Sequence, residues 1–178
     1  MFCDIVTPED KYFDGDPREV LRQNLKRANE KGFTYYVSPE LEYFYFKDSD
    51  NTKLLDSSGY FDQENSDLGT DLRRETVLTL EELGIPVASS HHEAAPSQHE
   101  IDLRHTDALT MADTVMTYKT VVKEIAMKHG YFASFMPKPL SNINGSGMHT
   151  NVSLFKGDEN IFYSSSESHH ISETARQF

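Results

Sequence analysis

The chain has 178 residues, a length that suggests one domain rather than two. Hydrophobic residues make up 37% of it, and no run approaches the ~18 apolar residues of a membrane-spanning helix. Lysine and arginine number 17 against 29 aspartates and glutamates, so the net charge is −12. A surface that binds nucleic acid needs positive charge, so the composition argues against nucleic acid as a partner.

The N-terminal sequence and the single cysteine indicate the compartment in which the protein works. The N-terminus has no basic stretch followed by an apolar stretch, so no secretory signal is recognised. The one cysteine, Cys3, excludes an internal disulfide and fits a reducing compartment. We therefore expect a cytoplasmic protein without membrane contact. Its acidic charge has two explanations, a solvated acidic surface or carboxylates that point inward as metal ligands.

The first half of the chain predicts two helices around an aromatic strand. The first helix has an N-cap at Asp16, a proline in its first turn, and a natural stop at Gly32. Residues 33–46 are dense in aromatic side chains and predict one strand, or two strands broken at Pro39. A second helix is expected over 67–84.

The second half of the chain predicts several strands and one long helix. Two short strands are joined by a proline-containing connection, and a long helix, a third strand and a hairpin follow. The expected ranges are 85–93, 98–105, 107–129, 131–137, 148–155 and, as the second strand of the hairpin, 161–163. A further helix begins within 171–178. These elements predict an α/β or α+β domain.

The strand expected over 148–155 has an unusually polar face. Alternation places His149, Asn151 and Ser153 on one face and mostly apolar residues on the other. A Gly-Ser-Gly loop precedes it. Such loops let backbone N–H groups approach an anion or a carboxylate, although a tight turn before a strand explains the glycines equally well. The loop matches neither the phosphate-loop pattern nor the dinucleotide pattern.

Two glutamates lie two residues apart in the aromatic strand. Glu40 and Glu42 share one face because side chains alternate along a strand. Neighbouring like charges raise one pKa unless a cation lies between them. A solvent-facing edge is the alternative explanation, since charged residues are mostly exposed. The aromatic residues around the pair argue against exposure of the whole segment.

A second acidic pair flanks the proline-containing connection. If the two flanking segments are adjacent strands, Glu93 and Glu100 can meet across the hairpin. His91, His92 and His99 add possible contacts, although a single histidine is more often a satisfied or exposed residue. Hard cations need several carboxylates from different segments. Carboxylates and one histidine on strand faces could thus converge on two divalent cations bound with a nucleotide.

Four motifs, in this order, resemble bacterial glutamine synthetase of the type I class: SPELEYFYF, SHHEAAPSQHEID, ASFMPKP and NGSGMH. The resemblance covers essentially the whole chain. It implies an α+β fold of the glutamine synthetase catalytic-domain type, with a largely antiparallel sheet and packed helices, incomplete at both ends. Residues 1–178 would be part of that single domain, without the family's N-terminal β-grasp domain and the C-terminal part of the catalytic domain.

The resemblance also implies an activity. Members of the family are ATP-dependent glutamate–ammonia ligases, which form glutamine through γ-glutamyl phosphate. They use two or more Mg²⁺ or Mn²⁺ ions per site. The expected partners are glutamate, ammonia and ATP, and the full-length protein would be a homo-oligomer of two stacked hexameric rings. Because much of the site lies outside this chain, the isolated fragment is expected to be inactive.

The motifs assign roles residue by residue. One metal would be held by Glu42, Glu93 and Glu100, and the second by Glu40 and His149. Substrate glutamate would meet Asn144 and Gly145, and the nucleotide side would include His91, Asn151 and Ser153.

Two positions depart from the family pattern and bear on nucleotide binding. Ala88 stands where the family often has a glutamate that touches the nucleotide, and His105 stands where an aromatic residue near the adenine is common. Three alternatives remain: a γ-glutamyl ligase for another amine (polyamine or methylamine), a non-catalytic binding module, and a structural acidic domain. A silent relative is expected to lose metal ligands, and all five candidates are present.

Overall fold

A computed structural model describes residues 2–63 and 68–178. The chain divides into two compact units. Unit 1 consists of Met1–Val37, His105–Asp113 and Asn151–Phe178, and unit 2 consists of Ser38–Arg104 and Thr114–Thr150. None of the described helices is long and apolar enough to cross a membrane.

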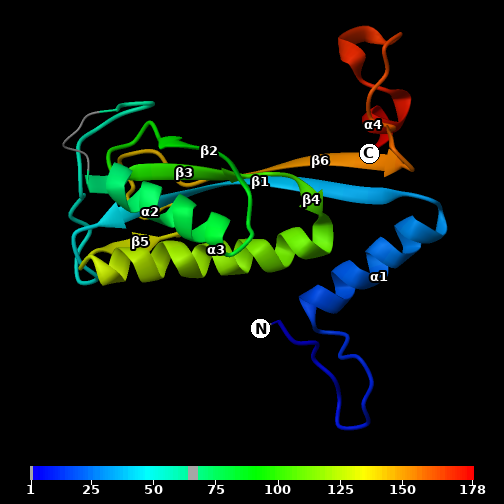
Figure 1. Ribbon diagram of the computed structural model, residues 1–178, viewed down its shortest axis with the longest axis horizontal. Helices are drawn as coiled ribbons and strands as arrows, with labels where there is room; N and C mark the ends of the chain where they lie inside the picture. Colours follow the sequence, from blue (N-terminus) through cyan, green and yellow to red (C-terminus); the bar gives the residue numbers. More distant parts are fainter. Residues whose placement is uncertain (1, 64–67) are drawn as a thin grey trace. The chain divides into compact units, whose positions relative to one another are not determined.

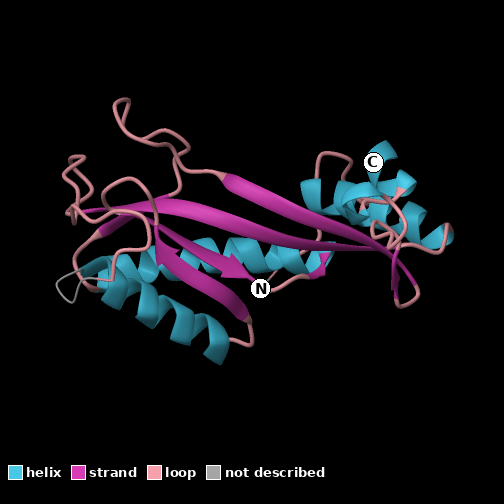
Figure 2. Cartoon of the chain, turned by 90° about the horizontal axis from the view of Figure 1, so that it is seen from above, coloured by secondary structure: helices cyan, strands magenta, loops and turns pink. Residues whose placement is uncertain are grey.

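The described residues form helices and antiparallel strands, which confirms the predicted α+β class (Figures 1 and 2). In chain order they are α1 (Pro17–Glu30), β1 (Thr34–Phe46), α2 (Leu68–Glu82), β2 (Val87–His92), β3 (Gln98–Leu103), β4 (Thr106–Asp107), α3 (Ala108–Lys128), β5 (Phe132–Ser134), β6 (Met148–Lys156), β7 (Glu159–Asn160), the 3-10 helix η1 (Ser168–His170) and α4 (Glu173–Gln177).

Unit 2 is built on the antiparallel strands β2, β3 and β1. Strand β3 lies between β2 and β1, and β5 pairs with the far end of β1 on its other edge. Leu41, which is directly opposite Ile101, and the fully buried Tyr43 face the helices. The hydroxyl of Tyr118 in α3 donates to the carbonyl of Leu41 at 3.2 Å, and α2 packs on β2 and β3. This helix-covered face leaves the opposite face of the sheet for polar side chains.

Strand β1 is continuous through Pro39, so the single-strand alternative is the correct one. The N–H of Tyr45 donates to the carbonyl of Ser97, and hydrogen-bonded pairs recur at every second residue of an antiparallel ladder. The same register places Pro39 opposite Leu103 at one of these hydrogen-bonded positions. Proline has no N–H to donate there. The hydroxyl of Ser38 donates to the Leu103 carbonyl at 2.7 Å instead. A neighbouring side chain thus satisfies the acceptor that Pro39 leaves.

Unit 1 confirms the expected first helix and corrects the hairpin. The Asp16 side chain accepts from the N–H of Arg18 at 3.0 Å at the start of α1, and Gly32 follows its end with a φ of +80°. The predicted second hairpin strand, 161–163, is wrong, because β6 pairs with Glu159–Asn160. The Asn160 side chain accepts from the N–H of Phe162 at 3.0 Å, which turns the chain away from the ladder.

Other elements agree with expectation in type and differ in length. The strand expected over 131–137 is limited to Phe132–Ser134. The terminal helix α4 is capped by Ser172, whose hydroxyl accepts from the N–H of Ala175 at 3.1 Å. The helix expected over 67–84 covers Leu68–Glu82; its expected first residue, Asp67, lies outside the described residues.

Replacement of Ile101 tests the buried face of the unit 2 sheet. Ile101 is fully buried, so Ile101→Ala is expected to lower the free energy of unfolding by about 2–5 kcal/mol. Leu78→Ala, at a side chain that is 54% exposed in α2, is the control and should change it far less. Equal effects in urea unfolding would contradict the assigned core.

Candidate functional site

A cavity of about 450 Å³ lies on the polar face of the unit 2 sheet. Its lining gathers all five predicted metal ligands together with His91. The lining residues are Glu40, Glu42, Tyr60, Phe61, Ser89, His91, Glu93, Glu100, Asp102 and His149. Four segments far apart in the sequence therefore contribute to one cavity.

Strand register brings the acidic side chains side by side. Glu42 lies directly opposite Glu100, and Glu100 lies directly opposite His91 on the next strand. In the neighbouring row, Glu40 lies opposite Asp102. Directly opposed residues of an antiparallel pair share a face and have closely spaced Cβ atoms. The polar face thus holds two adjacent rows of side chains with few cations among them.

The tightest group in the cavity is formed by His91, Glu93 and Glu100. The Nδ1 of His91 lies 3.6 Å from Oε1 of Glu93, and its Nε2 lies 3.5 Å from Oε2 of Glu100. One potential ligand atom from each residue lies within 4.8 Å of the other two. The structure thus brings Glu93 and Glu100 together across the β2–β3 hairpin, as expected from their positions.

Burial and neighbouring carboxyl groups change the protonation of Glu100. Burial raises the pKa of Glu100 to about 9, with further contributions from a hydrogen bond to Glu93 and the charge of Asp102. A carboxyl group with this pKa holds a proton at neutral pH. A divalent cation among these side chains would stabilise the ionised form, so the donor set fits a metal ion.

The second predicted pair lies in a more open part of the cavity. Nδ1 of His149 is 3.3 Å from Oε2 of Glu40, with side-chain exposures of 71% and 35%. The two side chains come from β6 and β1. An imidazole and a carboxylate at this distance can share a cation, and their exposure leaves room for other ligands.

The glycine-rich loop before β6 lies directly against Glu42. A Cβ at Gly147 would be 2.9 Å from Oε1 of Glu42, and the carbonyl of Gly147 accepts from the N–H of Glu42 at 3.2 Å. Gln98 Nε2 donates to Oε2 of Glu42 at 2.7 Å and to the carbonyl of Gly145 at 2.8 Å. The exposed Asn144 therefore belongs to a loop that is anchored beside a predicted metal ligand.

The remaining predicted nucleotide contacts lie in unit 1. Asn151, which is exposed, and Ser153, which is half-buried, continue β6 beyond His149. His105 also belongs to unit 1, where its ring lies edge-on to Tyr36 with 6.0 Å between centroids. Ala88 is exposed in β2 at a shift of register between Val87 and Ser89.

Some lining residues were not predicted from the sequence. Asp102 follows Glu100 by two residues, so alternation on its own strand indicates its position. Phe61 comes from a loop with no periodic signal. Its ring stacks on His91 at 4.6 Å and 12°, its φ is +59°, and its N–H donates to the carbonyl of His92 at 3.0 Å. Tyr60 accompanies it at the cavity.

A second group of titratable residues is buried in the same unit. Asp56 lies 2.9 Å from Nε2 of His92 and 3.4 Å from Nε2 of His99. Burial acts to raise the pKa of Asp56, but hydrogen bonds from both histidines and from the backbone of Ser97 hold it well below its usual range. Burial lowers the pKa of His99 to about 4, and the nearby charges of Arg73 and His92 act in the same direction.

This buried group does not fit a metal ion. A guanidinium nitrogen of Arg73 lies 2.7 Å from Nδ1 of His99 and can only donate. The His99 ring must accept at Nδ1, so its proton is on Nε2, facing Asp56. A metal-bound Nε2 would require the proton on Nδ1 instead. The cluster is therefore better explained as a hydrogen-bonded support of the hairpin.

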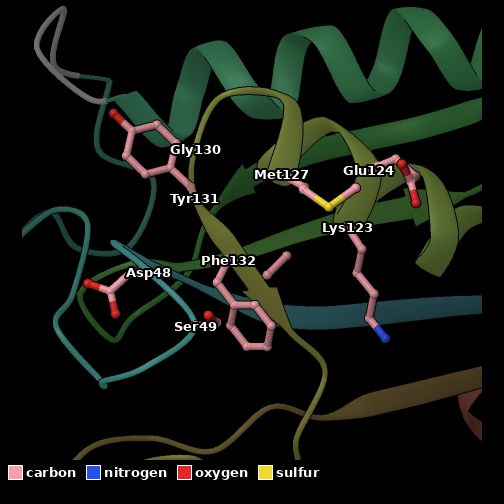
Figure 3. Close-up of a pocket in the computed structure, with 9 residues that line it drawn as sticks. Asp48, Ser49, Lys123, Glu124, Met127, Gly130, Tyr131 and Phe132 are labelled. Atoms are coloured by element: carbon pink, nitrogen blue, oxygen red, sulfur yellow. The ribbon is translucent and has the colours of Figure 1, made fainter.

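Another cavity in unit 2, of about 490 Å³, contains none of the predicted site residues. It is lined by Asp48, Ser49, Lys123, Glu124, Met127, Gly130, Tyr131, Phe132 and Ala133 (Figure 3). The charged groups of Asp48, Lys123 and Glu124 point in different directions in Figure 3. This cavity lacks the converging carboxylates of the first one.

The buried His99 predicts a pH dependence of stability. Its pKa is about 4 when folded and near 6.5 when unfolded, so the unfolded chain binds the extra proton first as pH falls. The free energy of unfolding should therefore decrease as pH is lowered from 6.5 toward 4. Urea unfolding of His99→Gln should lack this component, whereas the exposed control His129→Gln should retain it. Identical pH slopes in all three proteins would contradict the assignment.

Comparison with known proteins identifies the family. The family model described as "Glutamine synthetase, catalytic domain" matches residues 14–178. A glutamine synthetase of Clostridium saccharobutylicum is 48% identical over 182 residues, covering 100% of this chain and 41% of that protein. One from Staphylococcus aureus is 48% identical over 183 residues with the same coverage. The chain spans about two fifths of the length of these curated relatives.

Solved structures agree with this match. The cryo-EM structure of Plasmodium falciparum glutamine synthetase has a TM-score of 0.87 at 30% identity, covering 97% of this chain and 40% of that one. Apo GmaS has a TM-score of 0.87 at 31% identity, covering 94% and 41%. With the sequence match over residues 14–178 and this shared fold, the chain belongs to the glutamine synthetase catalytic-domain family.

Proposed function

We propose that this chain carries the metal-binding part of the active site of a glutamate–ammonia ligase. The reaction would use ATP to activate the γ-carboxylate of glutamate as γ-glutamyl phosphate, from which ammonia displaces phosphate. The observation that carries this proposal is the convergence of Glu40, Glu42, Glu93, Glu100 and His149 on one cavity. Identity of 48% to glutamine synthetases supports it.

Glu42, Glu93 and Glu100 would hold one divalent cation. Their carboxylates come from β1, from the residue after β2, and from β3, and burial together with the neighbouring carboxyl groups of Glu93 and Asp102 raises the pKa of Glu100. The side-chain amide of Gln98 donates both to the carboxylate of Glu42 and to the carbonyl of Gly145 in the glycine-rich loop. Three carboxylates from separate segments match the oxygen-rich coordination of Mg²⁺ or Mn²⁺.

Glu40 and His149 would hold the second cation at the open part of the cavity. Imidazole is a softer donor than carboxylate. This pair should therefore favour Mn²⁺ over Mg²⁺ more than three carboxylates would. Bound there, the ions would neutralise phosphate charge and orient ATP against glutamate. His91, held between Glu93 and Glu100, faces the same space and is our candidate for a phosphate contact.

The loop before β6 is our candidate for the binding of substrate glutamate. Asn144 offers an exposed amide, and Gly145 is tied to Glu42 through Gln98. Asn151 and Ser153 would lie on the nucleotide side. With Ala88 and His105 in place of the family's usual residues, we expect the nucleotide contacts to differ from those of relatives that have glutamate and an aromatic residue there.

A γ-glutamyl ligase that uses another amine is the second candidate. The structure called GmaS has the same TM-score as the Plasmodium glutamine synthetase, at 31% against 30% identity. Fold similarity therefore does not separate the two, whereas the 48% identity to curated glutamine synthetases favours ammonia. Polyamine and methylamine are the alternative substrates.

The proposal extends to the whole protein. The described units would be part of one catalytic domain, with a β-grasp domain before it and the rest of the catalytic domain after it, in a cytoplasmic homo-oligomer of two stacked hexameric rings. The coverage of about two fifths of its relatives supports this domain arrangement.

Manganese titration tests the metal assignment. In the 178-residue chain, Glu93→Ala and His149→Ala should each weaken Mn²⁺ binding by about tenfold or more, because each removes a direct ligand. Glu75→Ala is the matched control, since Glu75 is a partly exposed carboxylate of α2 that pairs with Lys128 at the end of α3 and with His129 directly after it. The affinity and the number of bound ions can be measured by electron paramagnetic resonance. Unchanged binding in both site variants would refute the assignment.

Activity of the isolated chain is a separate test. We expect the 178-residue chain to bind Mn²⁺ but to form no γ-glutamyl hydroxamate from glutamine and hydroxylamine, because further parts of the site would come from other segments and a neighbouring subunit. Measurable hydroxamate formation by the purified chain would show that these residues suffice for catalysis.

A further inference from the structure

His92 lies behind the candidate metal cavity and contacts the backbone of a predicted metal ligand. It follows His91 on β2, and its side chain is fully buried. Its Nδ1 lies 2.6 Å from the carbonyl oxygen of Glu93, and its Nε2 lies 2.9 Å from Oδ1 of Asp56. A carbonyl and an ionised carboxylate only accept hydrogen bonds. The His92 ring therefore bridges the carboxylate of Asp56 and the peptide oxygen of Glu93.

Asp56 also holds the other end of the β2–β3 connection. The N–H of Ser97 donates to the same Oδ1 of Asp56 at 2.8 Å, and the N–H of Asp56 donates to the Ser97 hydroxyl at 2.7 Å. Ser97 has a φ of +60°, a conformation that L-residues seldom adopt. One carboxylate oxygen thus anchors His92 before Glu93 and Ser97 after it.

The backbone of Glu93 is consequently fixed on both sides. Its N–H donates to the carbonyl of Gln98 at 2.7 Å, and its carbonyl accepts from His92. Within the same connection, Ala95 is buried against Phe44 and Phe46. From this anchored backbone, the carboxylate of Glu93 accepts from the N–H of Ala94 at 2.9 Å and lies 3.6 Å from Nδ1 of His91.

We propose that His92 and Asp56 are positioning residues that hold the β2–β3 connection so that the carboxylate of Glu93 stays in the metal cavity. This inference rests on the proposed function, because it requires Glu93 to bind the metal. Neither residue lines the cavity. Their role is to reduce the rearrangement that Glu93 needs in order to bind a cation.

Two substitutions of His92 separate its two hydrogen bonds. The amide nitrogen of asparagine lies where Nδ1 lies, so His92→Asn retains a donor for the Glu93 carbonyl. The amide nitrogen of glutamine reaches the place of Nε2, so His92→Gln retains the contact with Asp56 alone. We expect His92→Gln to weaken Mn²⁺ binding by about tenfold. We expect the Mn²⁺ affinity of His92→Asn, which keeps the donor to the Glu93 carbonyl but loses the contact with Asp56, to lie between those of His92→Gln and the wild type.

Controls distinguish positioning from general destabilisation. His129→Gln makes the same change at a histidine that is 43% exposed and should leave Mn²⁺ affinity unchanged. Thermal unfolding of each variant reports folding. Ser97→Ala removes the hydroxyl that accepts from the N–H of Asp56 and donates to its carbonyl, and it should weaken Mn²⁺ binding by about threefold, which keeps the test valid if His92→Gln does not fold.

The outcomes separate this inference from the proposed function. Equal Mn²⁺ affinities of His92→Gln, Ser97→Ala and wild type, with Glu93→Ala impaired, would overturn the positioning role and leave the metal site intact. Equal losses in His92→Gln and His92→Asn would overturn it too, because rescue by the retained donor would be missing. Absence of any effect of Glu93→Ala would refute the metal site, and the positioning role with it.

Discussion

Repulsion among carboxylates on one face of a sheet is the constraint on which this structure depends. Glu42 opposite Glu100 and Glu40 opposite Asp102 place four acidic side chains in adjacent rows, and Glu93 joins them from the hairpin. Like charges directly opposite one another destabilise an antiparallel pair. Burial raises the pKa of Glu100, and the neighbouring carboxyl groups of Glu93 and Asp102 raise it further, because a proton relieves part of the repulsion. A divalent cation bound among these carboxylates would take the place of that proton.

Apolar packing on the opposite face of the same strands offsets the destabilisation caused by the crowded carboxylates. Leu41, Tyr43 and Ile101 alternate with the acidic residues along β1 and β3 and are buried. Burial of aromatic and aliphatic side chains stabilises the sheet by an amount that grows with the apolar area removed from water. The strict two-residue period of a strand therefore separates the two tasks, since one set of residues packs and the set between them faces the cavity.

The hairpin between β2 and β3 connects these two faces. Glu93 lies on the cavity side, whereas Asp56, His92 and His99 are buried behind it in a hydrogen-bonded group with Arg73. Arg73 determines the tautomer of His99, and Asp56 accepts from both sides of the connection. Polar groups can be buried without large cost when each finds a partner of the correct type. The buried cluster thus lies directly behind the turn from which Glu93 reaches the candidate cavity.

The sequence by itself determined the features that depend on local periodicity and local chemistry. Alternation along the strand placed Glu40 and Glu42 on one face. The N-cap at Asp16 and the helical spacing after it predicted α1, and the four motifs indicated the family. Only the tertiary structure decided the register of Glu42 opposite Glu100, the end of the last hairpin at Asn160, and the approach of Asp56 to His92 across 36 residues. The reason is physical: strand and helix periods are set by neighbouring residues, whereas register and buried hydrogen bonds depend on which distant segments pack together.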